Sequence, residues 1–133
     1  MPNRAIEIHD STLDHFIVHD GLLELHFSSA YIHYSEGRPG IDAGKGWTQE
    51  ARLLVKDRVI RSSFSSLPRD LEDGFIKTDE EVSDDLIPIP LNYNGSVEVR
   101  LESSGEILSV VGTQATLELF GEPSYVEEFR PHS

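Results

Sequence analysis

The most regular pattern in the chain is an alternation of apolar and polar residues on both sides of Asp20-Gly21. A period of two is typical of β-strands, and Asp-Gly suits a two-residue type I′ turn because both positions need positive φ. The turn sets the register of a β-hairpin in which His19 faces Leu22 and His15 faces His26. The apolar residues that share its core face are Phe16, Val18, Leu23, Leu25 and Phe27.

The apolar positions change parity after Phe27, from odd-numbered to even-numbered residues. One extra residue at Ser28-Ser29, a β-bulge, restores the alternation and lets one bent strand run to Glu36. The even-numbered residues that then face the core are Ala30, Ile32 and Tyr34. The odd-numbered residues that face away from the core are Tyr31, His33 and Ser35.

Two other parts of the chain have weaker patterns. Ala5 to Ile8 predicts a first strand, and the polar residues His9 to Thr12 predict a turn after it. Trp47 to Ile60 fits both helical and strand spacing, and we interpret it as strand because its flanks are glycine-rich and its neighbours alternate. Arg61 to Asp85 holds eight of the 24 acidic residues and predicts a long loop with a short strand at 75–77.

The last third of the chain predicts a series of hairpins. Ile87 to Leu91 alternates but contains two prolines, which places it at a sheet edge. A three-residue turn at Tyr93-Asn94-Gly95 pairs it with Val97 to Leu101, and a turn at Ser104-Gly105 pairs that segment with Leu108 and Val110. A further turn at Gly112-Thr113 aligns three more residues on the same face: Ala115, Leu117 and Leu119.

These elements predict the fold class. Pro123 suits the first turn of a helix, so Ser124 to Phe129 is expected to form one short C-terminal helix. The regular spacing of turn signals predicts an all-β antiparallel sandwich or partly closed barrel of about nine to eleven short strands. The 133 residues match the size of one domain with one core, so we assign 1–133 to a single all-β domain.

Composition narrows the classes of function. The 24 acidic and 11 basic residues give a net charge of −13, which disfavours binding to nucleic acid or to an anionic membrane surface. The chain has no cysteine, so thiolate metal sites and thiol catalysis are excluded. It has no apolar run as long as a signal peptide or membrane span, so a soluble, cytoplasmic protein is expected. An open sheet edge is compatible with a homodimer.

Two histidines form the sharpest candidate metal site. Directly opposed strand residues have Cβ atoms about 5 Å apart, so His15 and His26 could share one ion. Glu24 lies diagonally from His15 and offers a third ligand. Two histidines and one carboxylate form an open site of the kind that holds zinc or iron; apart from this candidate, the sequence predicts no cofactor.

A second candidate site surrounds the glycine-rich loop at 37–46. It differs from a P-loop, because Gly40 and Gly44 are one residue too close and Lys45 is followed by Gly46. A small ligand or anion site remains, with Arg38 as the clamp and Tyr31, His33, Tyr34 and Trp47 as nearby walls. The predicted ligand-binding set is Tyr31, His33, Glu36, Arg38 and Asp42.

The chain carries no strong catalytic motif. A Gly-x-Ser-x-Gly elbow is missing, and the acidic run from Asp70 to Asp85 does not match an EF-hand loop. The sequence therefore favours a non-catalytic binding or interaction module for a protein or small-molecule ligand. The alternative is an enzyme that uses His33 with Glu36 or Asp42, or the His15 and His26 pair, at the rim of the β scaffold.

Overall fold

The computed structural model describes residues 3–35, 37 and 43–129. This part of the chain forms ten β-strands and no helix, and it therefore holds no helical segment long and apolar enough to cross a bilayer. The strands are β1 (Asn3–His19), β2 (Leu22–Ser35), β3 (Gly44–Lys56), β4 (Val59–Ser62), β5 (Arg69–Asp70), β6 (Asp73–Thr78), β7 (Val82–Asp84), β8 (Leu86–Ile89), β9 (Asn92–Ser103) and β10 (Glu106–Phe129).

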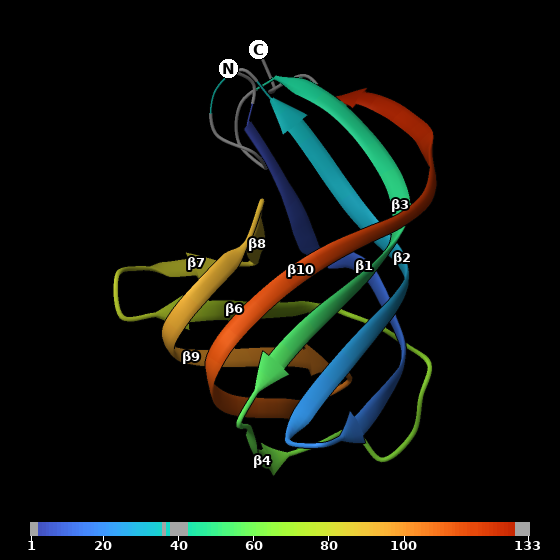
Figure 1. Ribbon diagram of the computed structural model, residues 1–133. Coiled ribbons are helices and arrows are strands. Elements are labelled where there is room, and N and C mark those ends of the chain that lie inside the picture. Colours follow the sequence, from blue (N-terminus) through green and yellow to red (C-terminus); the bar gives the residue numbers. More distant parts are fainter. Residues whose placement is uncertain (1–2, 36, 38–42, 130–133) are drawn as a thin grey trace.

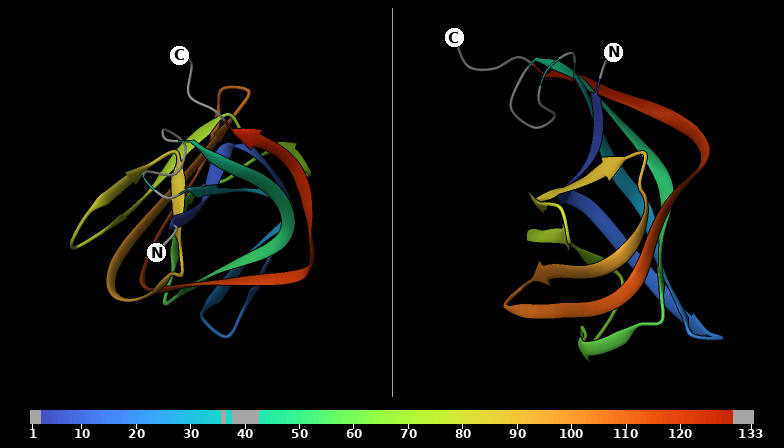
Figure 2. Two further views of the ribbon diagram at one scale, coloured as in Figure 1. Left: turned by 90° about the horizontal axis from the view of Figure 1, so that it is seen from above. Right: turned by 60° about the vertical axis from the view of Figure 1, so that its left-hand side comes forward.

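All ten strands belong to one antiparallel sheet. Its order is β5-β1-β2-β3-β10-β9-β6-β7, with β4 also paired to β10 and β8 also paired to β1. The sheet curls into a half-barrel whose lower end lies near β4 and β9 in Figure 1. At the upper end β1, β2, β3 and β10 curve round one another, as the view from above in Figure 2 shows. The all-β prediction is confirmed, and of its two alternatives, a sandwich and a partly closed barrel, the structure agrees with the second.

The hairpin of β1 and β2 has the predicted register. His19 pairs with Leu22 and His15 pairs with His26, while Asp20 and Gly21 have φ values of 48° and 76°. The predicted core face is correct at Leu23, Leu25 and Phe27, which are buried. It is wrong at Val18, which is 40% exposed, because the tip of the hairpin extends beyond the core.

The β-bulge at Ser28-Ser29 is confirmed. Phe27 pairs with Ala51 and Ala30 pairs with Gln49, so Ser28 and Ser29 lie opposite the single residue Glu50. The parity change therefore keeps Ala30 and Ile32 in the core. Tyr34 does not follow the prediction: it is 37% exposed, because β2 ends at the open end of the half-barrel.

The middle of the chain is more regular than the sequence suggested. The interpretation of Trp47 to Ile60 as strand is confirmed by β3 and β4. The predicted turn at His9 to Thr12 is wrong, because β1 continues through it as an irregular stretch. The expected loop over Arg61 to Asp85 contains β5, β6 and β7, and β6 pairs along β9 from Asp73 to Thr78.

In the last third of the chain, one predicted hairpin is confirmed, and the predictions for β8 and for Gly112-Thr113 are corrected. The turn at Ser104-Gly105 pairs Leu101 with Leu108 and Val99 with Val110, as expected. β8 pairs with β1 and not with β9, so Ile87 lies opposite Ile6. Gly112-Thr113 is a register shift within β10 and not a turn.

The C-terminal helix predicted for Ser124 to Phe129 is not seen. This segment continues β10 and pairs with β3, from Ser124 opposite Thr48 to Phe129 opposite Gly44. The backbone of β3 supplies partners for its N–H and C=O groups, which removes the need for local helical hydrogen bonds. Tertiary pairing therefore overrides the local signal of Pro123.

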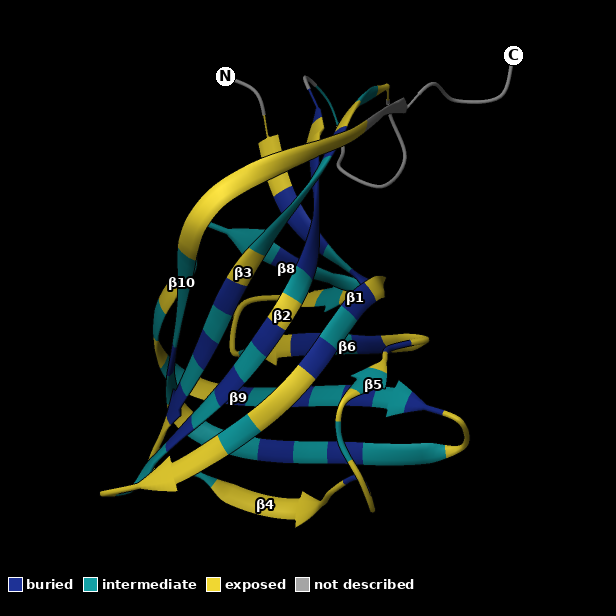
Figure 3. Ribbon diagram, turned by 90° about the vertical axis from the view of Figure 1, so that its right-hand side faces the viewer, coloured by how far each residue is buried: buried dark blue, intermediate teal, exposed yellow. Residues whose placement is uncertain are grey.

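The core fills the inside of the curl. Its fully buried large side chains come from nearly every long strand, and Figure 3 shows the alternation of buried and exposed residues along β1 and the exposed upper part of β10. The largest of these side chains are Phe27, Ile6, Ile8, Leu13, Leu23, Leu25, Leu53, Leu71, Ile76, Ile87, Leu101 and Leu108.

Candidate functional site

Two rows of paired residues cross the strands at the open end of the half-barrel. In the outer row Arg4 pairs with Tyr34, and Tyr34 pairs with Lys45, so an aromatic ring lies between two cations. In the next row inward Ile32 pairs with Trp47, and Trp47 pairs with Tyr125. Side chains of paired residues project from the same face of a sheet, so both rows face the same space.

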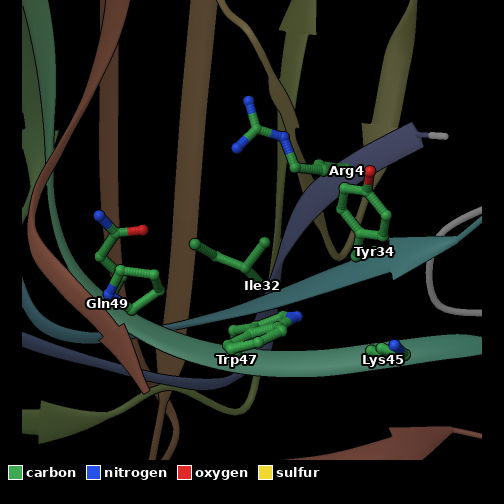
Figure 4. Close-up of a pocket in the computed structure, with 7 residues that line it drawn as sticks. Arg4, Ile32, Tyr34, Lys45, Trp47 and Gln49 are labelled. Atoms are coloured by element: carbon green, nitrogen blue, oxygen red, sulfur yellow. The ribbon is translucent and has the colours of Figure 1, made fainter. Parts of the chain in front are cut away.

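The two rows form a pocket of about 280 Å³, which we call the mouth pocket. Figure 4 shows the side chains of Arg4, Tyr34, Ile32 and Trp47 on one side of β1, β2 and β3. The residues that line the mouth pocket are Arg4, Ile32, Tyr34, Lys45, Trp47, Gln49 and Pro123. The described lining thus combines apolar and aromatic side chains with two cations and one amide, and it contains no carboxylate.

Trp47 is half-buried and holds the wall of the mouth pocket in place. Its ring meets that of Tyr125 edge to face, with centroids 5.0 Å apart and planes at 78°. This is a favourable geometry for two aromatic rings, and it links β3 to the upper part of β10. The sequence predicted Trp47 as a wall of the ligand site, and the structure places it against the core with one side open to the mouth pocket.

Comparison with protein-family models, curated proteins and solved structures finds no match.

The predicted ligand-binding set lies on the opposite face or outside the described residues. Tyr31 and His33 point away from the mouth pocket and are 8% and 1% exposed, so they do not form the open rim that the sequence suggested. Their rings lie over Gly46 and Gly44, which have no side chain to displace them. Glu36, Arg38 and Asp42 lie outside the residues that the structure describes.

His33 has a carboxylate neighbour on the adjacent strand. Its Nδ1 lies 3.8 Å from Oε1 of Glu7, and both side chains are largely buried. Nearby, the hydroxyl of Ser11 accepts a hydrogen bond from the backbone N–H of Tyr31 at 2.9 Å and donates one to the carbonyl of Glu7 at 2.8 Å. This polar cluster lies under the irregular stretch of β1 and fixes the path of the strand there.

The predicted metal set is arranged as a stack. The rings of His15 and His26 lie 4.4 Å apart with an angle of 13° between their planes. Nδ1 of His15 is 2.7 Å from Asp14, and Nε2 of His26 is 3.1 Å from Glu24. Each histidine thus has its own carboxylate, and the two rings do not aim their nitrogens at a common point.

Glu24 occupies the centre of a charge network on this face. Its carboxylate contacts His19, His26 and, at 3.2 Å, Arg52. The hydrogen bond with His19 is the largest of the effects that lower the pKa of Glu24, and His26 and Arg52 act in the same direction. Arg52 also binds Glu118 at 2.7 Å and lies over the ring of Phe120, so the network spans β2, β3 and β10.

Sequence reasoning found part of the mouth pocket and missed the rest. It named Tyr34 and Trp47 as walls and considered Lys45 only as a charge of the phosphate-binding loop that the motif test rejects, and it did not include Arg4 in any site. The predicted bulge at Ser28-Ser29 could have identified Lys45. With the bulge, Tyr34 and Trp47 project from the same face of the sheet. Lys45 is two residues from Trp47 in the same strand and therefore projects from that face too. Arg4 needed the register of β1 with β2 beyond the irregular stretch at residues 8–11, which the local pattern does not give.

Proposed function

We propose that this protein is a non-catalytic binding domain that holds a small, largely apolar molecule with an anionic group in the mouth pocket. The supporting observation is the row of Arg4, Tyr34 and Lys45 at the rim, above the apolar floor of Ile32 and Trp47. In a chain with a net charge of −13, two cations on one aromatic wall form a local site of opposite sign. Such a site favours an anion at the rim and apolar atoms below.

The size of the mouth pocket limits the ligand. Pockets for drug-sized molecules usually measure roughly 300–1,000 Å³, so a pocket of 280 Å³ suits a smaller molecule or one end of a longer one. Arg4 and Tyr34 provide hydrogen-bond donors for a carboxylate, and Lys45 adds a mobile ammonium group. An arylalkyl carboxylate such as 4-phenylbutyrate has this combination of groups.

The test uses the fluorescence of Trp47, the only tryptophan. We expect 4-phenylbutyrate to change the emission in a saturable way and its neutral amide, 4-phenylbutyramide, to bind more weakly. The double variant Arg4→Gln/Lys45→Gln should weaken binding of the carboxylate about fivefold, which corresponds to ~1 kcal/mol for a partly exposed charge contact.

The matched control is Arg61→Gln/Lys77→Gln, which removes two exposed cations outside the mouth pocket and changes the net charge equally. It should bind 4-phenylbutyrate like the wild type. Equal affinity for the acid and the amide, equal effects of the two double variants, or no change of emission at millimolar ligand would each refute the proposed function.

A further inference from the structure

The most irregular part of β1 brings three metal-ligating side chains together. Glu7 pairs with Tyr31 and Thr12 pairs with Ser29, so the four residues 8–11 of β1 lie opposite the single residue Ala30. In a regular strand His9 and Asp10 would point to opposite faces. Here one donor atom from each of Glu7, His9 and Asp10 lies within 4.8 Å of the others, and this is the one such group in the described part of the chain.

Asp85 fixes the orientation of the His9 ring. Oδ1 of Asp85 accepts the backbone N–H of His9 at 3.0 Å, and Oδ2 contacts Nδ1 of the same residue. Asp85 itself has φ 58°, a value uncommon outside glycine. Two backbone hydrogen bonds hold it there: its N–H donates to Gly74 at 2.8 Å and its carbonyl accepts from Ile8 at 2.9 Å.

This orientation is the one that metal-binding histidines use. Such a histidine commonly donates the N–H of one ring nitrogen to a carboxylate, which directs the other nitrogen at the ion. With Nδ1 held by Asp85, Nε2 faces the cluster, where it forms an ion pair with Oδ2 of Asp10 at 3.0 Å; a bound cation would take the place of the proton between them. Asp85 is not one of the three proposed ligands, so its contact with the His9 ring supports the site separately from the grouping of Glu7, His9 and Asp10.

The charges around His9 also favour a cation. Three carboxylates, those of Asp85, Asp10 and Glu7, lie close to the His9 ring. Glu7 in addition faces Nδ1 of His33 at 3.8 Å. His9 and Asp10 are exposed, so an ion could enter from solvent and keep water in its remaining positions.

We propose that Glu7, His9 and Asp10 bind a divalent transition-metal ion, with Asp85 as the carboxylate that orients His9. One imidazole and two carboxylates suit Zn²⁺, Co²⁺ or Mn²⁺ better than Ca²⁺, which prefers oxygen ligands alone. The site shares no residue with the mouth pocket, so its test does not depend on the proposed function.

The experiment is a calorimetric titration of the chelator-treated protein with ZnCl₂. We expect one site whose affinity falls at least tenfold in His9→Gln and in Asp10→Asn, and about tenfold in Asp85→Asn, which changes only the orienting residue. Asp14→Asn is the matched control: it lies in the same strand, removes the same charge and also takes a carboxylate from a histidine, His15 at 2.7 Å. Its affinity for Zn²⁺ should equal that of the wild type.

A second measurement needs no variant. Mn²⁺ added to the ¹⁵N-labelled wild-type protein should broaden the amide signals of Glu7 to Asp10 and Asp85 before those of His15 and His26. Broadening that begins at His15 and His26, Zn²⁺ affinity unchanged by His9→Gln and Asp10→Asn, or no Zn²⁺ binding at millimolar concentration would each overturn the proposal. If a variant is unfolded by circular dichroism, the Mn²⁺ result decides alone.

Discussion

Gly44 and Gly46 show how single residues permit the close approach of β2 and β3. A Cβ on Gly44 would lie 2.0 Å from the carbonyl oxygen of Tyr34, and one on Gly46 would lie 2.0 Å from the hydroxyl of Tyr31. Real Cβ atoms do not approach so closely, so either strand or side chain would have to move. At Gly44 the obstacle is backbone, which cannot rotate away as a side chain can.

We therefore expect Gly44→Ala to destabilise the fold by about 1–3 kcal/mol, the usual cost of overpacking. Urea unfolding followed by circular dichroism measures this change. Gly105→Asn serves as the control, because Gly105 has φ +77° and nothing within 4 Å of its Cβ position, and asparagine tolerates this backbone conformation. The control should lose less than about 1 kcal/mol of unfolding free energy; similar losses in both variants would contradict the steric explanation.

At the scale of residues, the sequence predicted which residues pair across the β1–β2 hairpin better than it predicted which side chains contact one another. The Asp20-Gly21 turn placed His15 opposite His26, since turn type and strand period together determine the register. The sequence pattern could not predict that the rings of these two histidines stack, or that Glu24 would bind His19 and His26. Those choices depend on side-chain rotamers and on Arg52, a residue of the third strand.

Among the elements, β2 depends most on one inserted residue. Its lower part buries Leu25 and Phe27, its upper part buries Ala30 and Ile32, and the bulge at Ser28-Ser29 makes both sets face the core. A strand with period two has no other way to change parity.

Deletion of Ser29 should therefore reverse the faces of everything from Ala30 to the end of β2. Ile32 would leave the core and Tyr31 would enter it, which should cost ~3 kcal/mol or more and reduce cooperative folding. Thermal unfolding by calorimetry measures this. Ser29→Ala keeps the residue and should change stability by less than about 0.5 kcal/mol; a deletion as stable as this substitution would show that the bulge is dispensable.

The errors at the scale of elements have a common cause. Ile87 to Leu91 looked like the partner of the next segment, yet β8 pairs with β1, about eighty residues earlier in the chain. Ser124 to Phe129 looked like a helix, yet it pairs with β3. A local pattern gives the type and phase of a strand but does not identify a distant partner, so the hairpins were the predictable part.

At the scale of the whole molecule, the residues that the structure describes form a half-barrel with one closed end and one open end. The lower end is covered by the connection from β4 to β6, where Phe64 and Leu71 are buried and Arg69 lies over the ring of Phe64. Glu106 anchors this connection, because it accepts the backbone N–H of Ser65 at 2.8 Å and binds Arg69 at 2.6 Å. The upper end carries the mouth pocket instead.

This anchor should make the closed end sensitive to acid. The hydrogen bond from the backbone of Ser65, followed by that from Arg69, lowers the pKa of Glu106 below its usual 4.5. Because the pKa of Glu106 is lower in the folded state than in the unfolded state, the ionised carboxylate stabilises the fold above pH 4.5. This contribution is lost as the pH falls through the pKa of Glu106 in the folded state. Glu106→Gln should therefore lower the urea midpoint at pH 7 by more than it does at pH 3.

Glu122→Gln, an exposed position of β10, controls for the loss of one negative charge from an acidic protein. The urea midpoint of Glu122→Gln should differ little from that of the wild type at both pH 7 and pH 3. A Glu106→Gln effect that stays constant from pH 7 to pH 3 would mean that the carboxylate contributes nothing through its ionisation.

The position of Trp47 makes the two ends of the molecule separately observable. Its emission reports the open end, where it meets Tyr125, whereas far-UV circular dichroism averages over all ten strands. If both signals change together during denaturation, the half-barrel is one cooperative unit. If the emission changes first, the upper strands open while the lower end stays folded, and a guest molecule could then enter by local unfolding without loss of the native state.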